Sequence, residues 1–235
     1  MSSKSPNSGA ADGTWPLLHL FYRIEYGAWA LLSAEEQIAA KTQMTALVQE
    51  IRAETKALLQ VLAMFTPKAD LGMILSAPDL HAVHAWEKRL TLALGPDVLT
   101  PCYSFFSTLE TTSSQSAPEV PPEDEVICFF PVNSRHVSTP VSGRPPSEGG
   151  ALDAVRRGVS GVLGSRAGVE AWVSCSTGLE EACCGVTLFA QTLGGIQRSV
   201  RQLREVPGFL CEADLGECYA GTSLPLDALF RRVQL

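Results

Sequence analysis

The stretch 72–77, GMILSA, recurs as GVTLFA at 185–190, and each copy leads into a segment with helical periodicity. Leu80 follows the first copy at the same offset as Leu193 follows the second. Around these copies, each half of the chain has the order strand, helix, strand, strand, helix, strand. That order is typical of a ferredoxin-like unit, with helices on one face of an antiparallel sheet. We therefore predict an α+β fold of two fused ferredoxin-like repeats, whose antiparallel sheets form a barrel-like body of the dimeric α/β-barrel type.

The elements follow from periodicity and from capping residues. Ser33 and Glu36 have capping-box spacing before an amphipathic helix, and Asp79 is placed to cap a second one. The expected helices cover Ala34 to Lys56, Asp79 to Gly95, Ala151 to Leu163 and a last segment marked by Leu193, Ile196, Val200 and Leu203. The expected strands cover Leu17 to Tyr26, Leu58 to Phe65, Leu71 to Ala77, Pro101 to Glu110, Glu125 to Asn133, Val169 to Ser176, Cys184 to Ala190 and part of Phe209 to Gly221.

Composition places the boundaries of the two halves. Residues 1–14 are rich in Ser, Gly and Ala and are predicted to be a disordered tail. The first half then covers 15–110, and the second covers 125–235. Between them, 111–124 is rich in Ser, Pro and acidic residues without periodicity, and is predicted to be a linker.

Charge and hydrophobicity exclude two classes of partner. The chain of 235 residues is 46% hydrophobic and 18% charged, with a net charge of −7. A net negative charge argues against non-specific binding of nucleic acid, which needs a cationic face. The chain lacks an apolar run of the roughly 18 residues that span a membrane. We expect a soluble cytoplasmic protein with neither nucleic-acid nor membrane partners.

The seven cysteines are irregularly spaced and include no CxxC pair, so neither a disulfide framework nor a zinc site is expected. Most lie within apolar runs and are predicted to be small buried hydrophobic residues. Cys183 and Cys184 are adjacent. Strand alternation would direct their thiols to opposite faces of the sheet.

Several blocks of the sequence resemble the chlorite dismutase family, especially its coproheme decarboxylase branch. They occur in the order of that family and cover most of the chain from Trp15. The blocks are WPLLHLFYRIEYGAW at 15–29, KADLGMIL at 68–75, PCYSFFS at 101–107, ICFFP at 127–131, STGLEEACCGVTLFA at 176–190 and YAGTSLP at 219–225.

The resemblance implies a haem or coproheme in the second half and subunits that assemble into rings, commonly pentamers. The branch uses peroxide to convert two propionates of coproheme to vinyl groups. Its iron-binding histidine belongs on the helix Ala151 to Leu163, where this chain has no histidine. Arg157, or Gly158 with a shift of one residue, takes that place. Arginine stays protonated and has no lone pair for iron, and glycine has no side chain.

The other functional positions of the family also differ. Phe130 stands where the family has its radical-forming tyrosine, and a phenyl ring has no O–H to oxidise. Ser134 replaces a lysine, and Ala171 falls on the distal glutamine position. The tryptophan-bearing turn has become Glu180 to Cys184. The scaffold is retained while the positions that touch iron or propionate are changed together, so no catalytic residue is predicted.

The histidines and arginines that remain are the candidates for binding. His19 is expected to be a structural, hydrogen-bonded residue of the first strand. His81 and His84 share a helix face with Glu87, in a spacing open to a metal but more typical of an exposed polar stripe. A loop follows the fifth strand and carries Arg135, His136 and Arg144. Arg135 and His136 are the predicted porphyrin-pocket contacts, and no metal site is predicted.

Three functions are compatible with these residues. The leading one is a degenerate, non-catalytic member that acts as a structural or regulatory subunit, as a homo-oligomer or in a ring with an active paralogue, and for which no cofactor is expected. The second is a haem-dependent oxidoreductase with an unconventional ligand, His136 or a cysteine. The third is a porphyrin carrier that binds haem or coproheme by burial and arginine contacts.

Overall fold

The computed structural model describes residues 14–110, 122–134, 148–163, 168–176, 178–206 and 213–235. The predicted tail, most of the predicted linker and most of the loop after the fifth strand lie outside these residues. Among the helices that are described, none is both long and apolar enough to cross a lipid bilayer.

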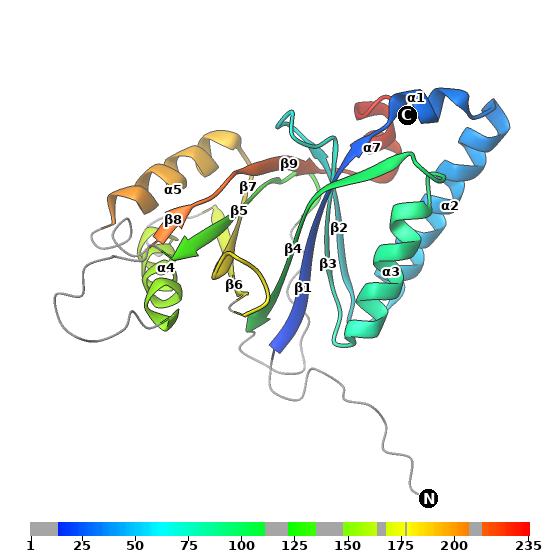
Figure 1. Ribbon diagram of the computed structural model, residues 1–235. Helices are drawn as coiled ribbons and strands as arrows, with labels where there is room; N and C mark the ends of the chain where they lie inside the picture. The colour runs from blue at the N-terminus through cyan, green and yellow to red at the C-terminus, as the bar shows by residue number, and fades with distance from the viewer. Residues whose placement is uncertain (1–13, 111–121, 135–147, 164–167, 177, 207–212) are drawn as a thin grey trace, which may run out of the picture.

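The first half is one ferredoxin-like unit. Its strands lie in the order β4-β1-β3-β2, all antiparallel. Helices α2 and α3 cover one face of this sheet (Figure 1). The elements in chain order are β1 (Thr14–Ile24), α2 (Ala34–Ala53), β2 (Leu58–Met64), β3 (Leu71–Ser76), α3 (Leu80–Leu92) and β4 (Leu99–Glu110), with a short α1 (Tyr26–Leu31) after β1.

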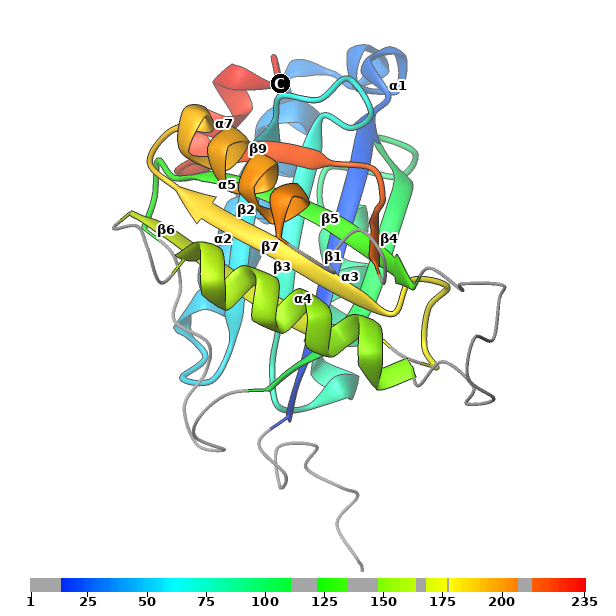
Figure 2. The same cartoon turned by 90° about the vertical axis from the view of Figure 1, so that its left-hand side faces the viewer.

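The second half repeats this arrangement. Its strands lie in the order β6-β7-β5, and β8 and β9 together form the fourth strand beside β5. Helices α4 and α5 lie side by side on the outer face of β5, β6 and β7 (Figure 2). The elements are β5 (Val126–Ser134), α4 (Glu148–Leu163), β6 (Val169–Cys175), β7 (Cys184–Ala190), α5 (Leu193–Glu205), β8 (Ala213–Leu215), β9 (Tyr219–Ser223) and a terminal α7 (Leu226–Arg232).

The two sheets close on each other along two seams. Strand β2 pairs with β9 over three residue pairs, from Leu62 with Ser223 to Met64 with Gly221. Strand β4 pairs with β6 through Thr108 and Cys175 alone. Because β5 also pairs with β7, the strands form a closed barrel with the helices outside it. The prediction of two fused ferredoxin-like repeats in a barrel-like body is confirmed.

Local sequence explains where the helices begin. The Ser33 hydroxyl accepts from the Glu36 N–H at 3.3 Å, and the Glu36 carboxylate accepts from the Ser33 N–H at 2.7 Å. This is the predicted capping box of α2. Asp79 caps α3 by accepting from the His81 N–H at 2.9 Å, and Thr192 caps α5. Leu80 and Leu193, expected on buried faces, are 51% and 44% exposed because both lie in the first helical turn, beyond these caps.

The last predicted strand is interrupted, which the sequence pattern did not predict. Pro131 of β5 has no N–H to give to a neighbouring strand. Opposite it, the partner strand breaks into β8 and β9, and Gly216 approaches closely enough for its N–H to donate to the Pro131 carbonyl at 2.8 Å. Helices α1 and α7 were also not predicted, since both are too short to show a periodic pattern.

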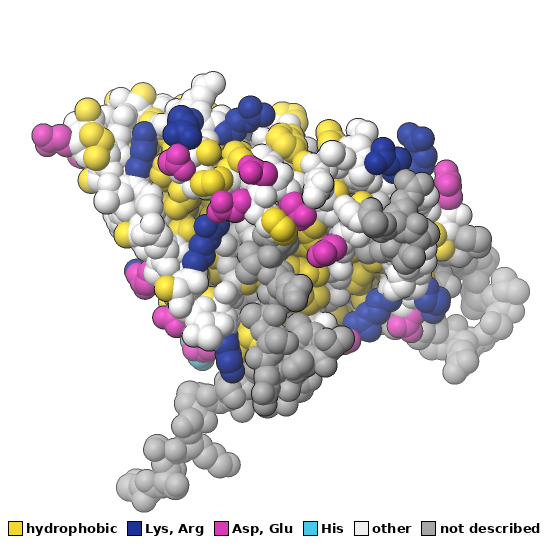
Figure 3. Space-filling view, turned by 180° about the vertical axis from the view of Figure 1, so that it is seen from behind, with side chains coloured by type: hydrophobic (Ala, Val, Ile, Leu, Met, Phe, Trp, Pro, Cys, Tyr) yellow, Lys and Arg dark blue, Asp and Glu magenta, His cyan; other side chains and the backbone are white. Residues whose placement is uncertain are grey.

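The surface carries charges of both signs. On the side opposite to the view of Figure 1, basic, acidic and hydrophobic side chains are interspersed (Figure 3). Although the net charge is −7, the acidic side chains on that side do not form one continuous acidic patch.

A β-carbon at Gly221 should disrupt the β2–β9 seam. Built on the existing backbone, it would lie 2.6 Å from the Ala63 carbonyl oxygen, which belongs to the backbone and cannot move aside. We expect Gly221→Ala to lower the free energy of unfolding by about 1–3 kcal/mol, measured by urea denaturation. The control is Gly27→Ala in α1, where a β-carbon meets nothing within 4 Å. Equal effects of the two substitutions would show that the close approach is relaxed at little cost.

Candidate functional site

Three of the positions singled out in the sequence lie at one surface: Phe130, Gly158 and Ala171. Strands β5, β6 and β7 turn one face inward to the barrel and the other outward to α4 and α5 (Figure 2). We call the outward side the C-terminal outer face. The buried side chains on it belong to Val126, Cys128, Phe130, Val132, Cys184, Val186, Leu188 and Ala190.

The helix that covers this face presents glycine and valine to it. In α4, Val155, Gly158 and Val159 are buried at helical spacing, whereas Arg157 is exposed. Of the two residues that sequence comparison left open, Gly158 is therefore the one that faces the sheet. Arg156 also points elsewhere, because its guanidinium pairs with the Glu110 carboxylate of β4 at 2.9 Å.

The space beside Phe130 is filled by the chain itself. Phe130 is 2% exposed and Val155 is 0% exposed, and both belong to one hydrophobic cluster with Val159, Val186 and residues of α5. Ala171 of β6 packs against the same cluster. Haem iron takes an axial ligand with a lone pair, such as His, Cys, Met or Tyr. The helix α4 supplies no such ligand, and buried apolar side chains fill the space between α4 and Phe130, so this part of the face does not fit the group.

The turn before β7, at Glu180 to Cys183, links the two halves of the barrel. The Glu180 carboxylate accepts from the Phe106 N–H of β4 at 2.9 Å, and the Cys183 N–H donates to the Val132 carbonyl at 3.0 Å. The turn therefore forms hydrogen bonds with the backbone of both β4 and β5. These bonds hold the two halves of the barrel together.

His19 is structural, as predicted. It is fully buried in the barrel interior, its Nε2 lies 3.0 Å from Thr187 Oγ1, and its ring stacks on Phe129 with centroids 4.1 Å apart. Burial disfavours the charged imidazolium and lowers the pKa of His19 to about 3. A neutral, enclosed imidazole of this kind has no access to a substrate.

The other predicted positions do not assemble into a site. His81, His84 and Glu87 lie along a groove of about 490 Å³ between α3 and strands β1 and β4. Among the described residues, no three His, Cys, Asp or Glu side chains are grouped to hold a metal ion. Arg135, His136 and Arg144 lie outside the described residues, so the predicted porphyrin contacts stay a prediction.

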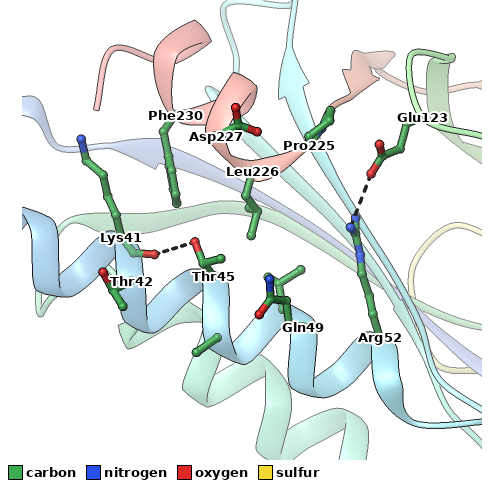
Figure 4. Close-up of a pocket in the computed structure, with 12 residues that line it drawn as sticks. Lys41, Thr42, Thr45, Gln49, Arg52, Glu123, Pro225, Leu226, Asp227 and Phe230 are labelled. Atoms are coloured by element: carbon green, nitrogen blue, oxygen red, sulfur yellow. Dashed lines mark hydrogen bonds and ion pairs between the residues drawn. The ribbon is translucent and has the colours of Figure 1, made fainter.

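A second groove, of about 560 Å³, lies between α2 and α7 (Figure 4). Its charged side chains are already partnered. Arg52 pairs with Glu123 at 3.6 Å, Asp227 pairs with Arg231 at 3.1 Å, and the Lys41 ammonium lies 5.5 Å from the Trp29 ring centroid. The Thr45 hydroxyl donates to the Lys41 carbonyl at 2.8 Å. The groove thus offers little unsatisfied polar chemistry for a ligand.

The cysteines differ from the prediction. Of the six that are described, only Cys128 and Cys184 are buried, so the expectation that most would be buried is wrong. The sulfur atoms of Cys183 and Cys184 lie 3.8 Å apart instead of on opposite faces. Strand alternation does not apply to this pair, because β7 begins at Cys184 and Cys183 belongs to the preceding turn.

Sequence reasoning missed one close pair. Cys128 and Cys218 bring their sulfur atoms to 2.8 Å from positions 90 residues apart. The repeat alone indicated that β5 and the last strand are neighbours in a ferredoxin-like sheet. The signal that would have sharpened this is Pro131, because a proline cannot donate to the ladder and so marks a position where regular pairing is interrupted.

No protein-family model matches the sequence. Solved structures do match the fold along nearly the whole chain. A heme-binding protein from Thermus thermophilus is 22% identical, with a TM-score of 0.77 over 94% of this chain and 97% of its own. Two variants of the chlorite dismutase of Candidatus Nitrospira defluvii are 15% and 17% identical, each with a TM-score of 0.72. They cover 96% of this chain and 97% and 96% of their own, and the second was solved with cyanide. The chain therefore has the chlorite dismutase fold.

Proposed function

We propose that this chain is a degenerate relative of the chlorite dismutases, which keeps their scaffold without the haem-iron reaction and acts as a structural or regulatory subunit. The observation that carries the proposal is a glycine on the side of α4 that faces the sheet. Gly158 takes the place expected for the iron ligand, and the helix Glu148–Leu163 contains no His, Cys, Met or Tyr that could replace it.

The packing of the C-terminal outer face supports the same proposal. Phe130, Val155 and Val186 fill the region that a porphyrin would occupy if it lay between α4 and β5. Displacing such a cluster would expose well-packed apolar side chains, each worth about 1.5–3 kcal/mol of burial. The side chains at this face therefore stabilise the subunit itself. Retention of a complete barrel with altered site positions fits a subunit whose role is assembly, as a homo-oligomer or with an active paralogue.

A spectroscopic titration with haem b and coproheme tests the proposal. We expect no saturable shift of the Soret band beyond that of free porphyrin, because α4 has no side chain that can bind iron and the space between α4 and β5 is filled by apolar side chains. The Thermus thermophilus heme-binding protein, titrated in parallel, is the positive control for the fold. A saturable shift at micromolar or tighter affinity, with turnover of coproheme by peroxide, would contradict the proposal. His136→Ala would then test the substitute ligand.

A further inference from the structure

The Cys128–Cys218 pair lies at the interruption of the last strand. Cys128 is on β5, and Cys218 is in the three-residue link between β8 and β9. In the β5–β9 register, Cys128 is opposite Ala220. Cys218 is two residues before Ala220, so it lies diagonally opposite Cys128 on the same face. Both thiols are free. A disulfide would need their sulfur atoms to approach by only about 0.8 Å more.

The two thiols are unequal in access and in acidity. Cys218 is exposed, whereas Cys128 is buried. The hydrogen bond from Cys128 lowers the pKa of Cys218, partial burial opposes this, and the charge of Lys68 lowers it further. The same hydrogen bond and burial raise the pKa of Cys128. The exposed thiol is thus the attacking one, and the buried thiol is placed to resolve an adduct.

A groove opens directly over the pair. Its volume is about 510 Å³, within the range of small-molecule pockets. Ile196 and Val200 of α5 and Ala220 of β9 make it apolar, and Arg201 and Arg204 line it as well. Both arginines are exposed. Guanidinium groups beside a thiol pair favour a ligand that carries carboxylates.

We propose that Cys128 and Cys218 form a thiol–disulfide exchange site for small disulfides that carry carboxylates. The Cys218 thiolate attacks one sulfur of the disulfide, its S–S bond breaks, and one thiolate leaves and takes up a proton. Cys128 then loses its proton to solvent and attacks the Cys218 sulfur, which releases the second thiol. The net reaction oxidises the protein dithiol to a disulfide and reduces the small disulfide to two thiols. The proposal does not rest on the proposed function, because its evidence is the two thiols and the groove, and not α4.

Exposure of the reduced full-length protein to oxidised glutathione tests the proposal, with peptide mapping by mass spectrometry. We expect a Cys128–Cys218 disulfide in the wild type and a stable glutathione adduct on Cys218 in Cys128→Ala. Cys218→Ser should form neither product. Cys102→Ser removes another exposed cysteine and should leave the yield of the disulfide unchanged. Circular dichroism establishes that each variant is folded.

The arginines are tested through the charge of the probe. In the double variant Arg201→Gln/Arg204→Gln, adduct formation with oxidised glutathione should slow about tenfold, as expected when electrostatic attraction is removed. The rate with uncharged 2-hydroxyethyl disulfide should not change. Equal slowing with both probes would overturn the anionic specificity. Oxidation mapped to Cys183 and Cys184 only, or undiminished oxidation of Cys218→Ser at Cys128, would overturn the site.

Discussion

Acidification should destabilise the protein through one buried histidine. The pKa of His19 is lowered from 6.5 to about 3 in the folded state, so below pH 6.5 the unfolded chain binds a proton that the folded chain does not. His19 therefore contributes stability above pH 6.5 that is progressively lost down to about pH 3. The loss over that range is on the order of 5 kcal/mol. About 2 kcal/mol of it falls between roughly pH 6.5 and 5, above the range in which most carboxylates titrate. Urea denaturation across that interval measures the slope.

Two variants isolate the contribution of His19. His19→Gln retains a polar group toward Thr187 without a titrating ring, and we expect it to remove most of the slope. His84→Asn changes an exposed histidine of α3 and should leave the slope as in the wild type. If the wild type and His19→Gln lost stability in parallel, the pH dependence would belong to other groups.

Truncation of Phe129 should cause a large loss of stability. This side chain is buried in the barrel interior, with ring centroids 4.1 Å from His19, 5.1 Å from Phe105 and 5.8 Å from Phe21. Phe129→Ala removes the ring on which these three neighbouring rings pack. Because the barrel is closed, the surrounding strands cannot move far enough to fill the cavity that is left. We expect a loss of about 3–5 kcal/mol in the free energy of unfolding, a large share of the roughly 5–15 kcal/mol of a typical domain.

The matched control for this substitution is Phe65→Ala. Phe65 follows β2 and is 44% exposed, so its truncation should cost little. Both variants are measured by urea denaturation at neutral pH, where His19 is uncharged. A loss below about 1 kcal/mol for Phe129→Ala would mean that the barrel interior repacks around the missing ring.

Much of the fold was predictable because each half repeats one pattern. The capping residues Ser33 and Asp79 and the apolar run 184–190 are local signals, and the structure places each element within a few residues of its prediction. The interruption opposite Pro131 was not predicted, since it depends on which strand becomes the neighbour of β5. The exposure of Leu80 and Leu193 likewise depends on where the first helical turn ends relative to the sheet.

The absence of an iron ligand at the candidate site was predictable from the sequence, but the exact residues that face the sheet were not. The sequence is enough to show that α4 lacks an iron ligand. It could not decide between Arg157 and Gly158, because a shift of one residue on a helix changes the facing direction by about 100°. The sequence also did not show that Cys128 and Cys218 are close in space. Their approach depends on the register of the strands and on the interruption between β8 and β9.

Closure of the barrel has a consequence for how this chain must fold. The β2–β9 seam joins residues 62–64 to residues 221–223, so the interior around His19 and Phe129 stays open to water until residues 221–223 are available. Contacts of such sequence separation slow folding. A ribosome-bound first half would display an unpaired edge at β2 until residues 221–223 are synthesised. An unpaired edge of this kind is a template for pairing with another chain until β9 covers it.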